Sequence, residues 1–430
     1  MKQIKLTITA LSALAIGKQK SGGSISEAES YIPGSVIRGA IAFQILRQAN
    51  QRNSDLSQNG GDFQSLFLAE NSATFQNAYP AIAKVEKDTL KLVDEDIYVL
   101  PATAVSSKTN PGFKSEDGEE KGGVFDTLID RFCAEAYNHP YDPNCPKDND
   151  RVEPFSGFYS KNNSNYRSHS VTTRFLTRVG INRKRATAED NILYSIEVLN
   201  ESFLTNPNIK TGEFRKWEPF VYRSSIFVND DNLVELLLDF INKNDQSFRL
   251  GGSISRGLGR VRIEAEIVEV KSDIERRLKD FNDKLHERWK SWKIFDQNQL
   301  DLSEDCFYFT LDLQSDAIFT EQWQRTTVIS KTMLEQFTGV EDSGLKLEVA
   351  YSSYDYRSGW NAALGLMKDM ELITNRGAVY LFSASKDKWH DWIEALGELE
   401  MNGVGDRTCE GFGQVQVCNE FHNVFREAAV

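Results

Sequence analysis

The chain has 430 residues, of which 40% are hydrophobic and 26% are charged, and its formal net charge is -13. This length and composition allow roughly two or three globular domains and exclude a fibrous or disordered chain. No apolar run approaches the roughly 18 residues that a membrane-spanning helix needs. The five cysteines are irregularly spaced, which is typical of a reducing cytoplasm rather than of a disulfide framework. We therefore expect a cytoplasmic protein that has no membrane partner.

A strand and a helix are the first predicted elements. Ile4, Leu6 and Ile8 alternate with polar residues, the period-two pattern of a strand, and we interpret this start as mature protein rather than as a signal peptide. In YIPGSVIRGAIAFQIL, which begins at residue 31, Pro-Gly predicts a turn. Ser35 is then placed to cap a helix that is expected from Val36 onward.

A possible metal site follows in the segment 133–148. Cys133, His139 and Cys145 lie close in sequence, and Asp148 stands where a second cysteine would complete a Cys-x-x-Cys pair. A closed zinc site needs four ligands and usually contains such a pair. Two interpretations stay open, a zinc ion held by these four side chains or a metal-free loop; we expect no metal and no cofactor.

A basic stripe covers residues 161–188, where no Asp or Glu occurs. Tyr166, His169 and Phe175 are interleaved with its cations. Cations beside flat side chains are expected where a single-stranded nucleic acid crosses a surface. A solvated basic loop that is balanced by acidic neighbours is the alternative. The cations are Lys161, Arg167, Arg174, Arg178, Arg183, Lys184 and Arg185.

Two glycine-rich loops each follow a predicted helix and precede a predicted strand. The first lies between a helix at 232–240 and a strand at 261–267, and the second between a helix at 389–399 and a strand at 415–417. Their glycines and arginines are Gly251, Gly252, Arg256, Gly257, Gly259 and Arg260 in the first loop, and Gly403, Gly405, Arg407, Gly411 and Gly413 in the second.

The order helix, loop, strand is the reverse of a dinucleotide-binding loop, and neither loop has the Lys-Ser/Thr ending of a Walker loop. Nucleotide hydrolysis is therefore not expected. Backbone N–H groups of such loops can bind anions and arginines can clamp phosphates. A tight turn in which the glycines serve only backbone geometry is the alternative.

The two halves of the chain begin alike. Residues 307, 309, 311 and 313 are apolar and alternate like those of the first strand, and apolar residues recur at helical spacing over 274–292. We predict an α+β fold of tandem ferredoxin-like, or RRM-like, domains with glycine-rich loops. The first domain covers 1–271 with insertions at about 50–173, a connecting amphipathic helix covers 272–300, and the second domain covers 301–430.

Four motifs in this order resemble the RAMP superfamily, the repeat-associated proteins of CRISPR systems. They are YIPGSVIRGAI, TRVGINRKRATAEDNILYSIEVL at 177–199, LGGSISRGLGRV and NGVGDRTCEGFGQV. With SGWNAALGL at 358–366 and FH at 421–422, the tandem arrangement is most similar to the RAMP subunit of type III-D effector complexes, the Csx-ten family.

The resemblance implies a subunit that holds the 5′ tag of the guide RNA (crRNA) at the foot of a ribonucleoprotein complex. The implied partners are the crRNA, the large subunit and the backbone RAMP subunits, and indirectly the target RNA. The residues implied to line the RNA path are Ser35, Arg38, the stripe with Arg174, Arg178, Arg183, Lys184 and Arg185, and the two glycine loops. Tyr166, Phe175, Tyr194 and Phe412 are candidates for base stacking, with a place in the core as the alternative for each.

Two other functions stay open. Some RAMP proteins cleave precursor crRNA with a histidine and without metal; of the five histidines, His139, His169, His286, His390 and His422, only His169 lies within the stripe. Asp126, Asp130 and Asp190 are available for cleavage by an aspartate, and nothing in the sequence singles one out. A protein-interaction scaffold without RNA affinity would suit the acidic average. We expect no catalytic activity.

Overall fold

The structure is a computed structural model of the chain. It describes residues 1–18, 27–48, 61–69, 72–86, 89–92, 96–114, 121–162, 165–182, 184–185, 187–204, 216–269, 273–295, 301–361 and 365–430. Its α-helices are α1 (Gly34–Gln48), α3 (Asp62–Phe67), α4 (Leu128–Ala136), α5 (Asp231–Lys243), α6 (Ile274–Trp292), α7 (Lys331–Thr338) and α8 (Trp389–Asn402). Within these described ranges, no helix is both long and apolar enough to cross a membrane.

The first sheet has the strand order β17-β1-β16-β2, and β3 also pairs with β16. Its strands are β1 (Lys2–Ala10), β2 (Thr74–Phe75), β3 (Tyr79–Ala81), β16 (Val221–Val228) and β17 (Val261–Val268). Ile4, Leu6 and Ile8 are fully buried and share a core with Ile37 of α1 and Leu237 of α5. The alternation at the N-terminus therefore marks the face of β1 that the two helices cover, and the predicted strand is confirmed.

The second sheet has the strand order β25-β18-β24-β21, which matches the order β17-β1-β16-β2 of the first sheet. Its strands are β18 (Cys306–Leu313), β21 (Lys346–Tyr351), β24 (Val379–Ser385) and β25 (Val415–Val417). In chain order each sheet begins with a strand and a helix and ends with a helix and a strand. Strands β2, β3 and β16 come between them in the first sheet, and β21 and β24 in the second. In both sheets the last strand lies beside the first. The fold thus mixes helices with antiparallel sheets, as the sequence predicts.

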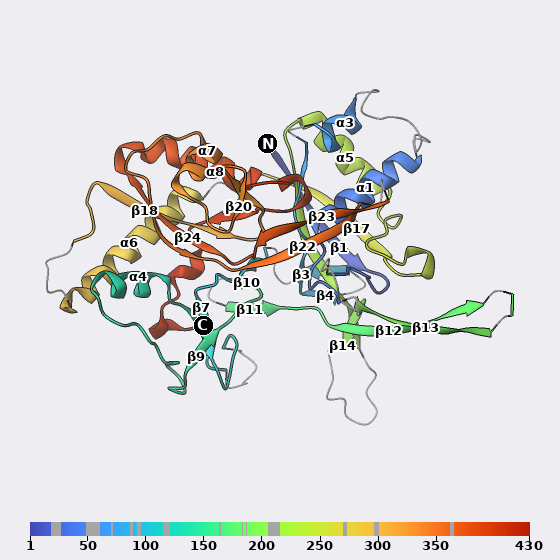
Figure 1. Ribbon diagram of the computed structural model, residues 1–430, viewed down its shortest axis with the longest axis horizontal. Coiled ribbons are helices and arrows are strands. Elements are labelled where there is room, and N and C mark those ends of the chain that lie inside the picture. The colour runs from blue at the N-terminus through green and yellow to red at the C-terminus, as the bar shows by residue number, and fades with distance from the viewer. Residues whose placement is uncertain are drawn as a thin grey trace.

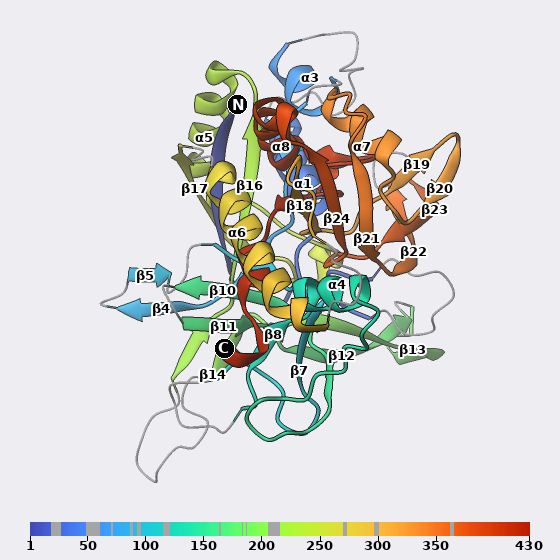
Figure 2. The same cartoon turned by 90° about the vertical axis from the view of Figure 1, so that its left-hand side faces the viewer.

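Helix α6 covers the second sheet. Its predicted apolar face is confirmed, since Leu278, Phe281 and Leu285 are buried in the same core as β18. On β18, Phe309 contacts Trp392 of α8, whereas Tyr308 contacts Phe132 of α4. Figure 2 shows α6 beside α4. Because β18 is buried on both faces, its polar-apolar alternation is weaker than that of β1.

The strands between β3 and β16 in the sequence form small sheets and hairpins that are separate from the first sheet. The β12–β13 hairpin projects from the body of the molecule (Figure 1). These strands are β4 (Ala83–Glu86), β5 (Thr89–Leu92), β6 (Tyr98–Val99), β7 (Ala104–Ser107), β8 (Val124–Asp126), β9 (Val152–Pro154), β10 (Phe158–Asn162), β11 (Asn165–His169), β12 (Thr173–Asn182), β13 (Thr187–Leu199), β14 (Ser202–Leu204) and β15 (Trp217–Pro219).

Two details differ from the sequence-based expectation. Strands β2 and β3 lie within the segment 50–173 that is expected to be inserted, yet both pair with β16; strands of two and three residues are too short to show a period. Helix α1 begins at Gly34, so Ser35 lies in its first turn and not at the capping position. The residue before the helix is Pro33, whose carbonyl accepts from the N–H of Val36.

The segment after β25 ties distant parts of the chain together. His422 is fully buried between two carboxylates, with its Nε2 2.7 Å from Asp312 Oδ1 and its Nδ1 3.2 Å from Asp126 Oδ1. Burial alone would lower the pKa of His422, but the charges of Asp312 and Asp126 raise it to about 10. A charged imidazole therefore joins β8 of the inserted part to β18 of the second sheet.

Candidate nucleic-acid interface

Both glycine loops border one groove with a volume of about 1660 Å³. Its walls come from α1, from the loop regions 247–254 and 407–412, from β13, and from the hairpin of β22 (Tyr354–Asn361) and β23 (Leu366–Thr374). In Figure 1 the β22–β23 hairpin reaches across toward α1. Two loops that lie far apart in the sequence thus meet at one surface.

The first glycine loop (251–260) has a tightly constrained backbone. Ser253 has a φ of 56° and is followed by a short 3-10 helix, η1 (Ile254–Arg256). A Cβ on Gly251 would lie 2.5 Å from the carbonyl oxygen of Ala15, and one on Gly259 would lie 2.6 Å from that of Leu250. These glycines are required because neighbouring backbone approaches so closely.

The second glycine loop (403–413) repeats this geometry. Arg407 has a φ of 61° and precedes the 3-10 helix η4 (Thr408–Glu410). A Cβ on Gly405 would lie 2.3 Å from the carbonyl oxygen of Ile318, and one on Gly413 would lie 1.8 Å from that of Val404. Close approach of the backbone thus accounts for Gly251 and Gly259 of the first loop and for Gly405 and Gly413 of the second. That both loops line the groove is a separate observation, and it is the one that bears on a ligand.

The second loop packs against the first turn of α1. The N–H of Gly34 donates to Oδ1 of Asn77 at 2.8 Å. A Cβ on Gly34 would lie 3.0 Å from the carbonyl oxygen of Glu410, and one on Gly411 would lie 2.7 Å from Oδ1 of Asn77. The start of α1 and the tip of η4 therefore form one edge of the groove, contributed by opposite ends of the chain.

Carboxylates of the protein pair several cations of the groove. Arg357 on β22 lies 2.6 Å from Glu29 and 3.1 Å from Asp316. Glu410 accepts from Arg407 at 2.6 Å and from Lys368 at 3.0 Å. The groove thus carries cations in a chain of negative net charge, and these three are charge-balanced in the free protein.

Apolar side chains form the remaining wall. Phe43 on α1, Leu68 and Ile254 are each about half exposed, at 53%, 52% and 48%. Phe412 is buried, with the guanidinium of Arg407 5.0 Å from its ring centre and that of Arg357 at 5.9 Å. An apolar wall beside cations suits a ligand that has both flat apolar surfaces and negative charge.

The basic stripe divides between two hairpins. Arg174 on β12 pairs with Glu201 at 2.7 Å and donates to Asn200, so an acidic neighbour balances it. Arg178 lies further along β12, while Lys184 and Arg185 lie at the turn of the hairpin. Arg183 lies outside the described residues.

The β12–β13 hairpin carries two of the predicted stacking residues. Phe175 is 58% exposed, and Tyr194 contacts the first loop. Arg256 of the first loop donates to the hydroxyl of Tyr194, and its guanidinium lies 5.5 Å from that ring centre. The hairpin and the first loop therefore meet through Arg256 and Tyr194.

The structure gathers only some of the predicted site residues. Those that line the groove are Ser35, Arg38, Gly251, Gly252, Arg407 and Gly411, together with Phe412. Those that do not line it are Arg174, Arg178, Lys184, Arg185, Arg256, Gly257, Gly259, Arg260, Gly403, Gly405 and Gly413. Lys368 and Arg357 line the groove and were not predicted, because each is an isolated cation within a hairpin and has no local motif.

Two candidates from the stripe are in fact core residues. His169 is only 4% exposed, and its Nε2 lies 2.7 Å from Oγ of Ser160. Tyr166 lies in an aromatic cluster with Phe113, Tyr159 and Phe421. His169 is thus buried, and Tyr166 is partly buried against this aromatic cluster.

The candidate aspartates on the described side chains also have structural partners. Asp126 contacts the buried His422. Asp130 is 1% exposed and receives two bonds from Arg288 at 2.6 and 2.8 Å and one from Nε1 of Trp292. The side chain of Asp190 lies outside the described residues.

The possible zinc ligands do not converge. Cys133 is buried in the core beside α6, Cys145 donates to the carbonyl oxygen of Gly122, and the ring of His139 lies 4.2 Å from that of Phe295. Asp148 accepts from Ser107 at 2.7 Å. No cluster of three or more metal-ligating side chains occurs in the part of the chain that the structure describes.

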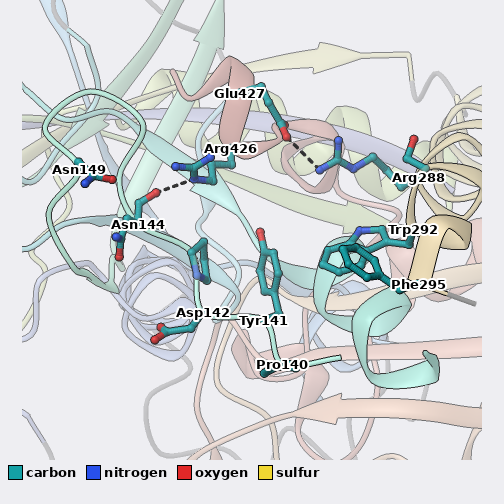
Figure 3. Close-up of a pocket in the computed structure, with 12 residues that line it drawn as sticks. Pro140, Tyr141, Asp142, Asn144, Asn149, Arg288, Trp292, Phe295, Arg426 and Glu427 are labelled. Atoms are coloured by element: carbon teal, nitrogen blue, oxygen red, sulfur yellow. Dashed lines mark hydrogen bonds and ion pairs between the residues drawn. The ribbon is translucent and has the colours of Figure 1, made fainter. Parts of the chain in front are cut away.

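A second cavity of about 540 Å³ lies where this inserted loop meets α6 and the C-terminal segment (Figure 3). Arg426 donates through Nε to the carbonyl oxygen of Asn144 at 2.6 Å, and Arg288 pairs with Glu427 at 3.3 Å. Trp292 and Phe295 lie side by side at its other end. None of the residues that the sequence predicts to contact RNA lines this cavity.

Comparisons with known proteins place these features in context. The family model of the RAMP superfamily matches residues 7–262. No curated protein matches the sequence. Among solved structures, the chain is similar to a chain of the type III-B Cmr-beta complex bound to cognate target RNA and AMPPnP, with 11% identity, a TM-score of 0.39, and coverage of 96% of this chain and 98% of that chain.

A chain of the type III-B Cmr-beta complex bound to cognate target RNA gives 10% identity, a TM-score of 0.38 and coverage of 93% and 96%. A chain of the same complex in its apo state gives 12% identity, a TM-score of 0.29 and coverage of 61% of this chain and 96% of that chain.

Proposed function

The chain belongs to the RAMP superfamily, and from this premise we propose that it is a non-catalytic RNA-binding subunit of a type III CRISPR effector complex. Its groove would hold the 5′ tag of the crRNA, and other surfaces would contact the large subunit and the backbone RAMP subunits of a cytoplasmic complex. The target RNA would be reached indirectly, through the crRNA. No cofactor is needed for this function.

A single observation carries the proposal. The two glycine loops, the first turn of α1 and the β22–β23 hairpin lie far apart in the sequence and border the same groove. A solely structural role for each loop would require its backbone geometry, but it would not require both loops to face one shared cavity.

The groove offers the contacts that a single strand needs. Arg407 and Lys368 would bind phosphate oxygens, and the positive end of the α1 dipole would add to this edge. The bases would lie against the apolar wall that includes Phe43 and Ile254. Arg178, Lys184 and Arg185 would extend the path of the RNA along the β12–β13 hairpin.

We further propose that each half is one ferredoxin-like domain. The shared strand order of the two sheets supports this assignment. The domains would cover 1–271 and 301–430, and the residues 272–300 would connect them. Helix α6, although a connector in sequence, packs with the second of these domains.

The endoribonuclease alternative is less well supported. The histidine that the sequence favours for metal-independent cleavage, His169, is buried and bonded to Ser160. A general acid or base has to lie within hydrogen-bonding reach of the reacting hydroxyl. The alternative of a protein-interaction scaffold without RNA affinity, by contrast, expects acidic residues that pair with the groove cations. RNA affinity is therefore the property to measure.

The test is binding of the full chain to a labelled single-stranded RNA derived from a CRISPR repeat, over a series of salt concentrations. Two variants are compared with the wild type, a groove variant with Lys368→Ala and Arg407→Ala and a hairpin variant with Arg174, Arg178, Arg183 and Arg185 changed to Ala. Lys279→Ala with Lys284→Ala, on the exposed face of α6, is the matched control.

We expect wild-type affinity to fall with salt, and the slope in the groove variant to be shallower by about 0.7 for each phosphate contact that is lost. The control keeps the wild-type slope. If the wild type binds no RNA even at low salt, the scaffold alternative replaces this proposal. If the RNA is cut in the same samples, the endoribonuclease alternative replaces this proposal.

A further inference from the structure

The cations of the groove are already paired within the protein, and these pairs differ in how accessible they are. Arg357 lies between Glu29 and Asp316, whose side chains are only 8% and 6% exposed. Since Glu29 precedes α1 and Asp316 follows β18, this buried cluster joins the two halves of the chain. Displacing it would break the structure that forms the groove.

Glu410 is different, because its pair lies at the rim. Its side chain is 18% exposed, and those of Arg407 and Lys368 are each 29% exposed. All three line the groove. A ligand can therefore reach both cations without opening the buried cluster.

The geometry around Glu410 resembles that of a bound phosphate oxygen. A single oxygen, Oε2, accepts from the guanidinium of Arg407 at 2.6 Å and from the ammonium of Lys368 at 3.0 Å. Charge-assisted bonds of this kind are the ones that guanidinium and ammonium groups also make to phosphodiester oxygens. The backbone carbonyl oxygen of Glu410 lies beside the first turn of α1.

Glu410 also carries its charge. Burial raises the pKa of its carboxyl group, but Arg407 and Lys368 lower it by more, and the net shift is downward. At neutral pH the two cations thus share one full negative charge that belongs to the protein.

We propose that Glu410 is an internal substitute for an RNA phosphate, which holds Arg407 and Lys368 in the free protein and is displaced when a strand enters the groove. The proposal rests on the function proposed above and adds a means of selecting the ligand. A polyanion that makes only charge contacts has to compete with Glu410 for the two cations. A strand whose bases also pack against the apolar wall gains additional binding free energy, which is enough to displace Glu410.

The experiment compares Glu410→Gln with the wild-type full chain, using the same labelled single-stranded RNA over a salt series. Glutamine keeps the size of the side chain and removes its charge. Glu348→Gln is the matched control, because Glu348 accepts from Lys346 at 2.6 Å and is 15% exposed, but lies on β21 outside the groove lining.

We expect Glu410→Gln to bind RNA roughly five- to tenfold more tightly at low salt, since two cations no longer compete for an internal anion. Its slope of log affinity against log salt should equal that of the wild type, because Arg407 and Lys368 contact phosphates in both complexes. Glu348→Gln should behave as the wild type does. Tighter binding by Glu410→Gln supports the proposal even when the wild type binds below detection.

Two other results would overturn the proposal that Glu410 substitutes for an RNA phosphate, and they differ in meaning. If the wild type binds RNA and Glu410→Gln binds with the same affinity, Glu410 does not compete, and the proposed RNA site stands without it. If neither protein binds RNA, the function itself fails. Glu410→Asp guards against misfolding of the first variant: its shorter side chain cannot reach both cations, so its affinity should lie between those of the other two.

Discussion

The two glycine loops share one backbone and differ in charge. In the register of the two sequences, 251–260 corresponds to 405–414. Each loop places a non-glycine residue in the left-handed region, continues with a single 3-10 turn, and returns through two glycines of positive φ. At the last position of that turn, however, the first loop has Arg256 and the second has Glu410.

The backbone conformation of each loop and the contacts of its side chains therefore have different causes. Two equivalent pairs of glycines, Gly251 with Gly405 and Gly259 with Gly413, are dictated by carbonyl groups that approach to within 3 Å of an added Cβ. Such groups are present in both halves because both halves have the same strand order. The charge depends on the neighbour that each turn faces. Arg256 reaches Tyr194 of a projecting hairpin, whereas Glu410 reaches two cations of the groove.

The strands that come after the two loops differ in length. Strand β17 continues for eight residues after the first loop, but β25 has only three before the chain turns toward His422. We infer that the second loop depends on the buried His422 cluster for its anchorage, and the first does not.

His422→Gln gives the largest expected effect. It leaves the carboxylates of Asp126 and Asp312 buried without their cation, and breaking a buried ion pair in this way costs about 3–5 kcal/mol of unfolding free energy. Denaturant unfolding measures the loss, and amide exchange should increase in 403–417 more than in 251–260. His286→Gln, a partly exposed histidine on α6, is the control; equal stability of the two variants would contradict the anchorage.

The pH dependence of stability gives a second reading of the same cluster. The pKa of His422 is 6.5 in its unperturbed state and about 10 in the folded protein. A raised pKa stabilises the fold fully below the lower value, and this stabilisation is lost as the pH rises through the higher one. The unfolding free energy of the wild type should therefore fall between pH 6.5 and 10, and that of His422→Gln should fall less.

Gly413→Ala tests the shared backbone and has the next largest effect. An added Cβ would lie 1.8 Å from the carbonyl oxygen of Val404 at a φ of 65°, so we expect a loss of about 3 kcal/mol, near the upper end of single-residue strain. Gly257→Ala also has positive φ, but no heavy atom lies within 4 Å of the added Cβ. It should lose about 1–2 kcal/mol; equal losses in thermal unfolding would mean that close contact does not explain the glycines.

Sequence patterns predict the local elements of this comparison well. The helices before both loops and the strands after them lie where apolar spacing places them, because each buries one face against a sheet. Strands β2 and β3 escape such patterns, since two or three residues cannot display a period. The capping position at α1 is missed by two residues, because Pro33 already provides the fixed φ that starts the helix.

The site is less predictable, because it depends on distant contacts. Nothing local indicates that Lys368 meets Glu410, or that Arg174 meets Glu201. A basic stripe without acidic residues therefore overstates the free positive charge of the folded surface. Likewise, His169 looks available in sequence, and only the pairing of β11 with β10 turns it into the core.

Arg256→Gln gives the smallest effect and isolates the difference between the loops. Arg256 contacts the hairpin through Tyr194 and pairs with no carboxylate among the described residues. Its loss should therefore lower RNA affinity roughly two- to fivefold and make the salt slope shallower by about 0.7. Glu410→Gln at the equivalent position should instead raise the affinity and leave the salt slope unchanged. Lys279→Gln on α6 is the control in the same binding assay. If Arg256→Gln matches that control while Glu410→Gln binds more tightly, only the second loop contacts RNA, and the first is a structural copy of it.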